Sequence, residues 1–138
     1  MEKAKTRKKV INDRLKLTKE QVLRKSEKIM SKLFSLDAFK EAKLIMFYVD
    51  MRNEVMTKES ITKALALGKR VVVPKVKQDR KLLPVEIQSL DDLALAGFGI
   101  LEPVTDVGVE PGKIDLIVVP GVAFDKNRFR LGYGGGYY

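Results

Sequence analysis

Three continuous apolar runs mark the chain, and each has the length of a β-strand. They cover residues 44–49, 70–74 and 114–119 and consist mainly of valine, isoleucine and leucine. None of them alternates polar with apolar positions, which is typical of strands that are covered on both faces. A fourth segment, 82–87, alternates less cleanly and contains Pro84, which has no N–H to donate. We therefore expect this segment to be an outer strand.

Helical periodicity fills the stretches before and between these runs. Residues 3–16 have the pattern of a basic helix with Val10, Ile11 and Leu15 on its apolar side. Thr18 followed by Gln21 fits a capping box and predicts the start of a second helix. The positions that share the apolar face of this second helix are Val22, Ser26, Ile29, Met30 and Leu33.

Two further helices are predicted before the second strand. A short one covers residues 37–42, and a longer one covers 58–67, with Thr57 as its N-cap and Gly68 as its C-terminal stop. Residues 90–95 form a short helical or irregular connection. The inward positions of the longer helix are Ile61, Ala64 and Leu65.

Strands that alternate with helices predict the α/β class. We expect a three-layer, mostly parallel sheet flanked by helices, of the Rossmann-like kind, in which the ligand site lies off the carboxyl ends of the strands. A length of 138 residues suits one domain with a real core. The sequence therefore predicts a single domain over residues 1–138.

Composition removes several kinds of chemistry. The chain has no cysteine and no histidine, which excludes a disulfide framework, a thiolate nucleophile and the usual general base at neutral pH. No apolar run approaches the roughly 18 residues of a membrane-spanning helix. The charged start lacks the apolar stretch of a secretory signal and only weakly resembles a transit peptide, so we expect a cytoplasmic protein.

Positive charge is concentrated near the amino terminus. The net charge is +9, and residues 1–32 hold twelve basic and four acidic side chains, or +8. This pattern indicates an anionic partner, which composition leaves open among nucleic acid, an acidic membrane surface and a polyanionic small substrate. A solvated, lysine-rich helical face is the simpler interpretation.

The last nine residues, 130–138, combine an arginine with a glycine-rich stretch. Four glycines in the five positions 132–136 allow successive backbone amides to converge on an anion, which suits phosphate. Arg130 can bind phosphate oxygens in bidentate fashion, and Tyr137 and Tyr138 offer stacking surfaces. A flexible glycine-rich tail is the alternative.

The segment 120–138, PGVAFDKNRFRLGYGGGYY, resembles the signature of the 5-formyltetrahydrofolate cyclo-ligase family. The resemblance extends through the basic amino-terminal helix, Asn53-Glu54-Val55, Gly68-Lys69-Arg70 with Pro74, and the segment 97–103. It implies an enzyme that uses ATP and Mg²⁺ to convert 5-formyltetrahydrofolate to 5,10-methenyltetrahydrofolate, releasing ADP and phosphate through an iminophosphate.

The resemblance also implies roles for particular residues. Arg130 and Tyr137 are the catalytic candidates. The apolar wall near the pterin is Val49, and Glu54 is the carboxylate that contacts the pterin. The residues implied for ATP are Lys3, Arg7, Arg130, Leu131, Gly132, Tyr133, Gly134, Gly135, Gly136, Tyr137 and Tyr138. Those implied for the folate are Arg7, Val49, Glu54, Tyr133, Gly134, Gly135, Gly136 and Tyr137.

The sequence departs from the family pattern at three places. The family motif continues after its paired tyrosines into a metal-binding aspartate, whereas this sequence stops at Tyr138, so we name no metal ligand. We expect a fragment of a longer protein rather than a shortened paralogue. Tyr133 stands where other members have arginine, and Gly135 stands where some have lysine.

Three functions therefore remain open. The first is a cyclo-ligase that acts as a monomer on ATP and 5-formyltetrahydrofolate, with no nucleic-acid or membrane partner. The second is a non-catalytic folate-binding paralogue. The third is a basic nucleic-acid-binding protein, which the scarcity of aromatic residues among the surface lysines disfavours.

Overall fold

The computed structural model describes residues 2–79, 81–96 and 99–133. Its α-helices are α1 (Glu2–Leu15), α2 (Lys19–Ser35), α3 (Asp37–Glu41) and α4 (Lys58–Ala66). Its strands are β1 (Leu44–Met46), β2 (Arg70–Lys77), β3 (Lys81–Ile87), β4 (Leu93–Leu95), β5 (Leu101–Pro103), β6 (Leu116–Ile117), β7 (Ala123–Phe124) and β8 (Arg130–Leu131). Short 3₁₀ turns cover Leu90–Asp92 and Pro111–Lys113.

A four-stranded sheet forms the centre, in the order β3-β2-β1-β6. β1 runs parallel to both β2 and β6, whereas β3 is antiparallel to β2 and lies at the edge, with Pro84 opposite Pro74. The remaining strands form two separate hairpins, β4 with β5 and β7 with β8. The expected α/β class with a mostly parallel sheet is confirmed, and so is the outer position of the segment with Pro84.

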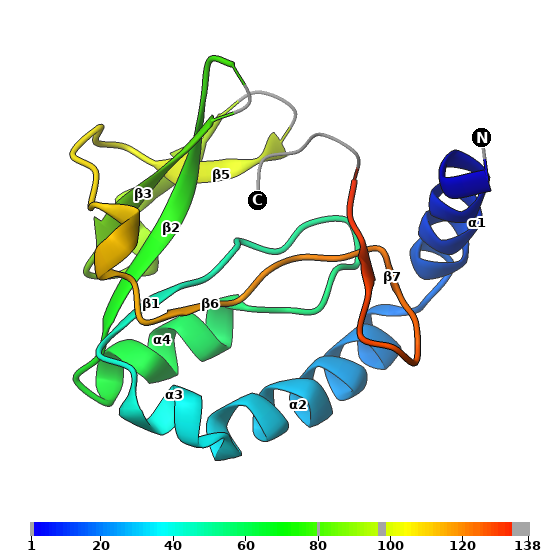
Figure 1. Ribbon diagram of the computed structural model, residues 1–138, viewed down its shortest axis with the longest axis horizontal. Coiled ribbons are helices and arrows are strands. Elements are labelled where there is room, and N and C mark those ends of the chain that lie inside the picture. Colours follow the sequence, from blue (N-terminus) through cyan, green and yellow to red (C-terminus); the bar gives the residue numbers. More distant parts are fainter. Residues whose placement is uncertain (1, 80, 97–98, 134–138) are drawn as a thin grey trace.

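The two faces of the sheet are covered in different ways. One face packs on α3 and α4 through Ile45, Val71 and Ile61, none of which is exposed (Figure 1). The opposite face, centred on Met46 and Val72, is packed by side chains of β3 and of the irregular chain before β6. The sheet is thus the middle layer, with helices on one side and irregular chain on the other.

The predicted helix signals gave mixed results. Thr18 and Gln21 form the expected capping box at the start of α2, and Gly68, with a φ of +84°, ends the turn after α4. Thr57 precedes α4 as expected, but its side chain makes no capping hydrogen bond. Its hydroxyl instead donates to the carbonyl of Tyr48, which lies earlier in the chain, at 2.7 Å.

Three apolar positions lie closer to solvent than their patterns indicate. Leu15 of α1 is 49% exposed and Ile29 of α2 is 46% exposed, although both belong to the apolar sides of their helices. Ile117 of β6 is also 46% exposed. β6 lies at the edge of the described sheet, and the exposure of Ile117 shows that this face of the strand lacks the cover that its apolar run predicts.

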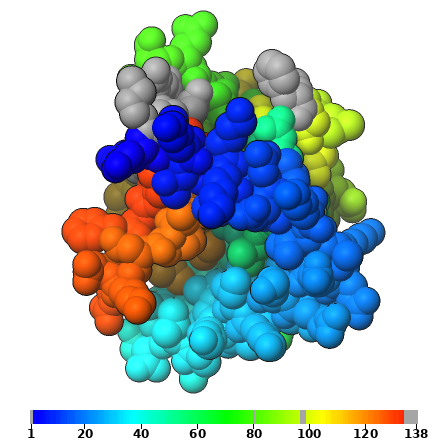
Figure 2. Space-filling model, turned by 90° about the vertical axis from the view of Figure 1, so that its right-hand side faces the viewer, coloured from blue at the N-terminus to red at the C-terminus, as the bar shows by residue number. Residues whose placement is uncertain are grey.

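The arrangement places α1 beside the carboxyl-terminal strands. In Figure 1 this helix stands at the end of the molecule next to the β7–β8 hairpin, far from the β2–β3 hairpin. The space-filling view shows the same neighbours: the blue residues of α1 lie against the red and orange chain (Figure 2). None of the helices in the described residues is long and apolar enough to pass through a membrane.

Candidate functional site

A cavity of about 340 Å³ opens where the parallel strands end. Its walls come from α1, α2, the loop after β1 and the chain after β6, which agrees with the expected position of a ligand site in this class of sheet. The residues that line it are Arg14, Leu17, Val22, Lys25, Ser26, Ile29, Met30, Tyr48, Asn53, Glu54, Val55, Val118, Val119, Pro120, Gly121, Val122 and Phe124.

The loop after β1 is held by its own polar contacts. Thr57 is fully buried, and its backbone N–H donates to Asp50 Oδ1 at 2.9 Å, while its hydroxyl accepts from the Asp50 N–H at 3.3 Å. The Tyr48 hydroxyl donates to the Val55 carbonyl at 2.8 Å. These bonds close the loop on itself, so the residues between them keep a fixed position.

Glu54 sits within this loop and is buried, with 7% of its surface exposed. Its Oε1 accepts from the Met51 N–H at 2.9 Å, and its Oε2 accepts from the Tyr133 hydroxyl at 2.6 Å. The loop reaches Glu54 through Arg52 and Asn53, whose φ values are +48° and +61°. A buried carboxylate at this place can accept hydrogen bonds from a ligand's N–H groups.

Arg14, in the last turn of α1, lies on the other side of the same hydroxyl. Its Nη1 donates to the Tyr133 hydroxyl at 2.8 Å, its Nε donates to the Arg52 carbonyl at 3.1 Å, and its Cζ lies 5.7 Å from the centre of the Tyr133 ring. Its Nη2 is enclosed and has no hydrogen-bond partner in the described part of the chain. The cavity therefore carries a cation next to the Glu54 carboxylate.

The Tyr133 hydroxyl keeps its proton at neutral pH. Burial and the hydrogen bond to Glu54 raise the pKa of Tyr133 from 10.0 to about 12, and the nearby Arg14 only partly opposes this shift. The hydroxyl can therefore donate to the carboxylate while it accepts from the guanidinium.

Asn53 joins the end of α1 to the loop. Its side-chain amide donates to the carbonyls of Arg14 and Leu17, both at 3.1 Å. The Arg14 carbonyl belongs to the last turn of α1 and also accepts from the Leu17 N–H, and Leu17 lies just beyond the helix, so this amide adds a cap to the helix end from another segment. The positive φ of Asn53 is one that asparagine tolerates better than most residues. The contact fixes Arg14 relative to Glu54.

Arg7, two turns before Arg14, reaches the start of the glycine-rich segment. Its Nε donates to the Gly132 carbonyl at 2.8 Å, across 125 residues of sequence. A Cβ on Gly132 would lie 2.8 Å from Arg130 Nη1, so the absence of a side chain at Gly132 allows the Arg130 guanidinium to lie close to the backbone there. Lys3 is exposed and lies one turn before Arg7.

Arg130 belongs to the β7–β8 hairpin and is exposed. Its Nη1 donates to the Pro120 carbonyl at 2.8 Å. The turn of the hairpin is built on Asp125 Oδ1, which accepts from the N–H groups of Asn127 and Phe129. Leu131 pairs with Ala123 in this hairpin, which sets the direction in which the chain enters Gly132.

The structure brings most of the implied site residues that it describes to one end of the sheet. Arg7 binds the Gly132 carbonyl, and Glu54 binds the hydroxyl of the next residue, Tyr133. Val49 instead packs against the buried core between the sheet and the helices α3 and α4. Tyr48, Val55 and Val122 are among the residues that form the cavity wall. The implied residues Gly134, Gly135, Gly136, Tyr137 and Tyr138 lie outside the part of the chain that the structure describes.

A protein-made metal site is not present in the described ranges. They contain no group of three or more acidic side chains placed to hold a metal ion. Asp125, the carboxylate in the β7–β8 turn, is engaged by two backbone N–H groups. The described residues therefore do not fit a resident metal.

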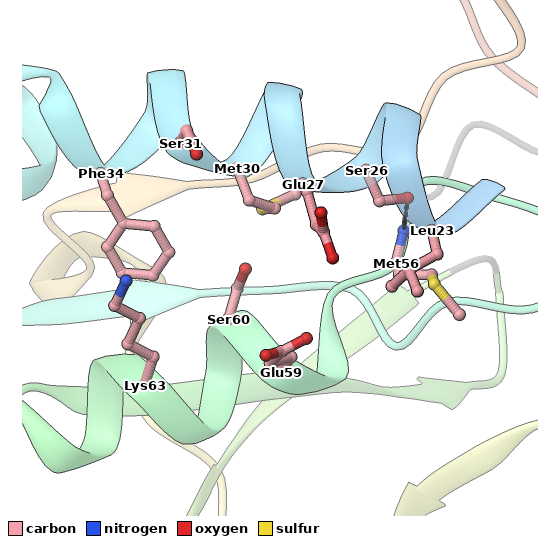
Figure 3. A pocket seen from close by; sticks show the side chains of 10 residues that line it. All are labelled: Leu23, Ser26, Glu27, Met30, Ser31, Phe34, Met56, Glu59, Ser60 and Lys63. Atoms are coloured by element: carbon pink, nitrogen blue, oxygen red, sulfur yellow. Dashed lines mark hydrogen bonds between the residues drawn. The ribbon is translucent and has the colours of Figure 1, made fainter. Parts of the chain in front are cut away.

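A second hollow of about 310 Å³ lies between α2 and α4. Figure 3 shows Glu27 and Glu59 pointing into it, with Lys63 against the ring of Phe34 at its far end. The Ser26 hydroxyl accepts from the Met56 N–H there at 2.8 Å. It shares Ser26 and Met30 with the first cavity, but its lining contains none of the residues that the sequence indicates for function.

A protein-family model described as the 5-formyltetrahydrofolate cyclo-ligase family matches residues 1–138. The chain belongs to this family. Among curated proteins, a probable 5-formyltetrahydrofolate cyclo-ligase of Caenorhabditis elegans is 32% identical over 131 residues, covering 89% of this chain and 64% of that protein. The 5-formyltetrahydrofolate cyclo-ligase of Mus musculus is 31% identical over 130 residues, covering 88% of this chain.

Solved structures of the cyclo-ligase family share the fold. The 5,10-methenyltetrahydrofolate synthetase of Aquifex aeolicus, determined by NMR, has a TM-score of 0.87 and 39% identity, covering all of this chain and 70% of that one. The corresponding synthetase of Mycoplasma pneumoniae has a TM-score of 0.77 and 27% identity, covering all of this chain and 75% of that one. The chain spans 64% of the length of each of the two curated relatives named above.

Sequence reasoning missed Arg14 and the capping role of Asn53. The signal for Arg14 was present, because it follows Arg7 by seven residues, or about two helical turns, and so lies on the same side of α1. Asn53 entered only as part of a motif, since its amide binds carbonyls 36 and 39 residues away.

Proposed function

We propose that this protein is a 5-formyltetrahydrofolate cyclo-ligase that uses ATP to form 5,10-methenyltetrahydrofolate. Membership of the family supports this proposal. The observation that carries it is the hydrogen bond from Arg7 to the Gly132 carbonyl, which joins the basic helix to the start of the glycine-rich segment. Beside this contact the cavity holds the buried carboxylate of Glu54. A cationic phosphate site and a pterin site would then be neighbours.

On this proposal, cations and backbone amides bind the triphosphate. Lys3, Arg7 and Arg130 supply positive charge, and the segment from Leu131 to Tyr138 supplies amides that glycine leaves accessible. Magnesium enters with ATP as part of the substrate. The charge of +8 over residues 1–32 favours the approach of ATP and of the folate's glutamyl tail, since both are polyanions.

The pterin occupies the cavity with its N–H groups on Glu54. The formyl oxygen then attacks the γ-phosphorus, the bond to the bridging oxygen breaks, and ADP leaves. N10 of the folate attacks the activated formyl carbon and gives up its proton to solvent, and the C–O bond to the phosphate breaks, which releases phosphate and closes the ring. The substrate provides both nucleophiles, so the protein acts by positioning and charge neutralisation. Arg130 and Tyr137 are the candidates for contact with the transferred group.

The same proposal includes one domain over residues 1–138, a monomer and a cytoplasmic location. One relative, from Arabidopsis thaliana, carries the name of a mitochondrial cyclo-ligase. Fractionation of cells that express the full gene product would decide the location, and light scattering would decide the oligomeric state.

The activity is tested with the full gene product, 5-formyltetrahydrofolate and MgATP. We expect the absorbance of the methenyl product to rise, with one ADP released per product molecule. Arg7→Met should raise the KM for ATP about tenfold or more, because it removes a charged hydrogen-bonding group. Arg24→Met is the matched control, since Arg24 is exposed on α2 in an ion pair with Glu20.

Two outcomes would contradict the proposal. A folded protein that binds 5-formyltetrahydrofolate without consuming ATP would be a non-catalytic folate-binding protein. A protein that binds neither ligand, but binds RNA or DNA tightly with a steep salt dependence, would be a nucleic-acid-binding protein.

A further inference from the structure

The Tyr133 hydroxyl fills a specific position between two charged side chains. It donates to Glu54 Oε2 at 2.6 Å and accepts from Arg14 Nη1 at 2.8 Å. One hydroxyl thus satisfies a carboxylate that needs a donor and a guanidinium that needs an acceptor. Any ligand that presents an N–H group next to a carbonyl group could satisfy both in the same way.

Arg14 also has a donor that this hydroxyl leaves unused. Its Nη2 is enclosed, yet it has no hydrogen-bond partner among the described residues. A buried donor without a partner is costly and uncommon in folded proteins, so it needs an explanation. Arg14 lines the cavity that also contains Glu54, which makes an acceptor on a bound ligand the natural partner.

We propose that Arg14 is a second residue that recognises the pterin: its guanidinium and the Glu54 carboxylate form a donor–acceptor pair that binds the adjacent carbonyl and N–H groups of the ring, in place of the Tyr133 hydroxyl. This inference rests on the proposed function, since it assigns a partner within the same cavity. It adds a specificity-determining residue from α1 that lies outside the residues implied by the family resemblance.

The chemistry of the pterin ring fits this pair. The ring carries an amino group at C2, an N–H at N3 and a carbonyl at C4, in that order along one edge. A carboxylate that takes the amino and N3 hydrogens leaves the carbonyl beside it for a cation. In the structure the guanidinium lies two hydrogen bonds from the carboxylate, through a single oxygen. The fork of the guanidinium allows one nitrogen to take the carbonyl while Nε stays on the Arg52 carbonyl.

Displacement of the hydroxyl links the two halves of the site. Tyr133 directly follows Gly132, whose carbonyl binds Arg7. When the ring takes the place of the hydroxyl, the tyrosine side chain must move, and the start of the glycine-rich segment moves with it. Binding of the ring therefore acts on the segment that we assign to the triphosphate.

The test compares two ligands on three forms of the full gene product by titration calorimetry. The ligands are 5-formyltetrahydrofolate and its 4-amino-4-deoxy counterpart, which replaces the carbonyl with an amino group. The protein forms are wild type, Arg14→Met and Arg14→Lys. Arg24→Met is the matched control, because it removes the same charge from an exposed position on α2. Urea midpoints establish that each variant is folded.

We expect Arg14→Met to raise the Kd of the 4-oxo ligand about 10- to 100-fold, which is the effect of losing one hydrogen bond to a charged group. The Kd of the 4-amino ligand should change by less than about threefold, because this ligand has no carbonyl that Arg14 could bind. Arg14→Lys should give an intermediate loss, since an ammonium cannot hold the Arg52 carbonyl and the ring together. Wild type should prefer the 4-oxo ligand, a comparison that does not depend on any variant.

Three results would overturn the inference. If wild type binds the 4-oxo ligand and Arg14→Met binds it equally well, the inference fails while the proposed function stands. If Arg14→Met weakens the binding of both ligands equally, Arg14 acts only on the shape of the site. If wild type binds neither ligand, the proposed function fails as well.

Tyr133→Phe tests the displacement itself. Without the hydroxyl, no group competes with the ring for the two charged side chains, so the 4-oxo ligand should bind more tightly than it binds wild type. Weaker binding would show that the hydroxyl contributes to the complex instead of giving way to the ring.

Discussion

Thr57→Val should destabilise the protein by about 1–2 kcal/mol, although it keeps the shape of the side chain. Thr57 is fully buried at the start of α4, and its hydroxyl donates to the Tyr48 carbonyl at 2.7 Å and accepts from the Asp50 N–H at 3.3 Å. Valine replaces this hydroxyl with a methyl group. Both backbone groups then lose this partner within the loop that holds Glu54.

The magnitude follows from two opposing effects. Removal of one partner from a buried hydrogen bond costs about 1–3 kcal/mol, because the polar group that remains has left water without compensation. Burial of the additional methyl group returns up to about 0.8 kcal/mol. No cavity forms, since the two side chains have the same shape. The net loss is therefore about 1–2 kcal/mol, which is a large part of the stability of a small domain.

Urea unfolding followed by far-UV circular dichroism measures this loss, because the chain has no tryptophan to report by fluorescence. The midpoint should fall while the slope of the transition stays constant. Thr62→Val is the matched control, since its hydroxyl donates to the Lys58 carbonyl from an exposed position on the same helix. That variant should stay within about 0.5 kcal/mol of wild type. Equal midpoints for Thr57→Val and Thr62→Val would refute the reasoning.

Three further outcomes are expected. Ser26→Ala should cost about 1 kcal/mol in the same urea assay, because the Met56 N–H loses its acceptor, whereas Ser31→Ala should be nearly neutral. Hydrogen bonds from the backbone N–H groups of Leu44, the first residue of β1, and of Lys43 before it lower the pKa of Asp115 below its ordinary 3.8. The contribution of this carboxylate to stability is present at neutral pH and is lost as the pH falls through the folded-state pKa, so the difference in urea midpoint between wild type and Asp115→Asn should shrink in acid. The pKa of Tyr133 is raised to about 12, so stability should decline between about pH 10 and pH 12, and Tyr133→Phe should remove this component of the decline.

The strands and helices were accessible from sequence because each depends on a local pattern. The run 44–49 is continuous and apolar, and its first three residues pair with neighbours on both sides as β1. The spacing of Thr18 and Gln21 carries its own capping geometry and predicted the start of α2 correctly. The prediction that Thr57 caps α4 failed for the same reason, because a threonine before a helix has the sequence signature of an N-cap whichever group its hydroxyl binds.

The site was accessible only in part, because its contacts join segments that lie far apart in the sequence. Glu54 entered through family resemblance, and nothing in the local sequence indicates that Tyr133, 79 residues later, binds its carboxylate. Arg14 was one of twelve basic side chains in its region. Its spacing places it on the same side of α1 as Arg7, but only its contacts show that it binds the loop and Tyr133. Ile117 shows the corresponding limit for burial, since an apolar run does not say whether both faces of the strand are covered in the folded protein.

The attachment of α1 explains why the site and this helix must form together. None of the residues of α1 is buried, so apolar packing contributes little to its position. Hydrogen bonds attach it to the rest of the molecule: Arg7 binds the Gly132 carbonyl, Arg14 binds the Arg52 carbonyl and the Tyr133 hydroxyl, and the Asn53 amide binds the carbonyls at the end of the helix. Such bonds each contribute only about 0.5–1.5 kcal/mol, or somewhat more where the donor is charged. Every one of these partners belongs to a segment that we assign to the ligands, so a ligand that orders those segments also fixes the helix that carries the cations.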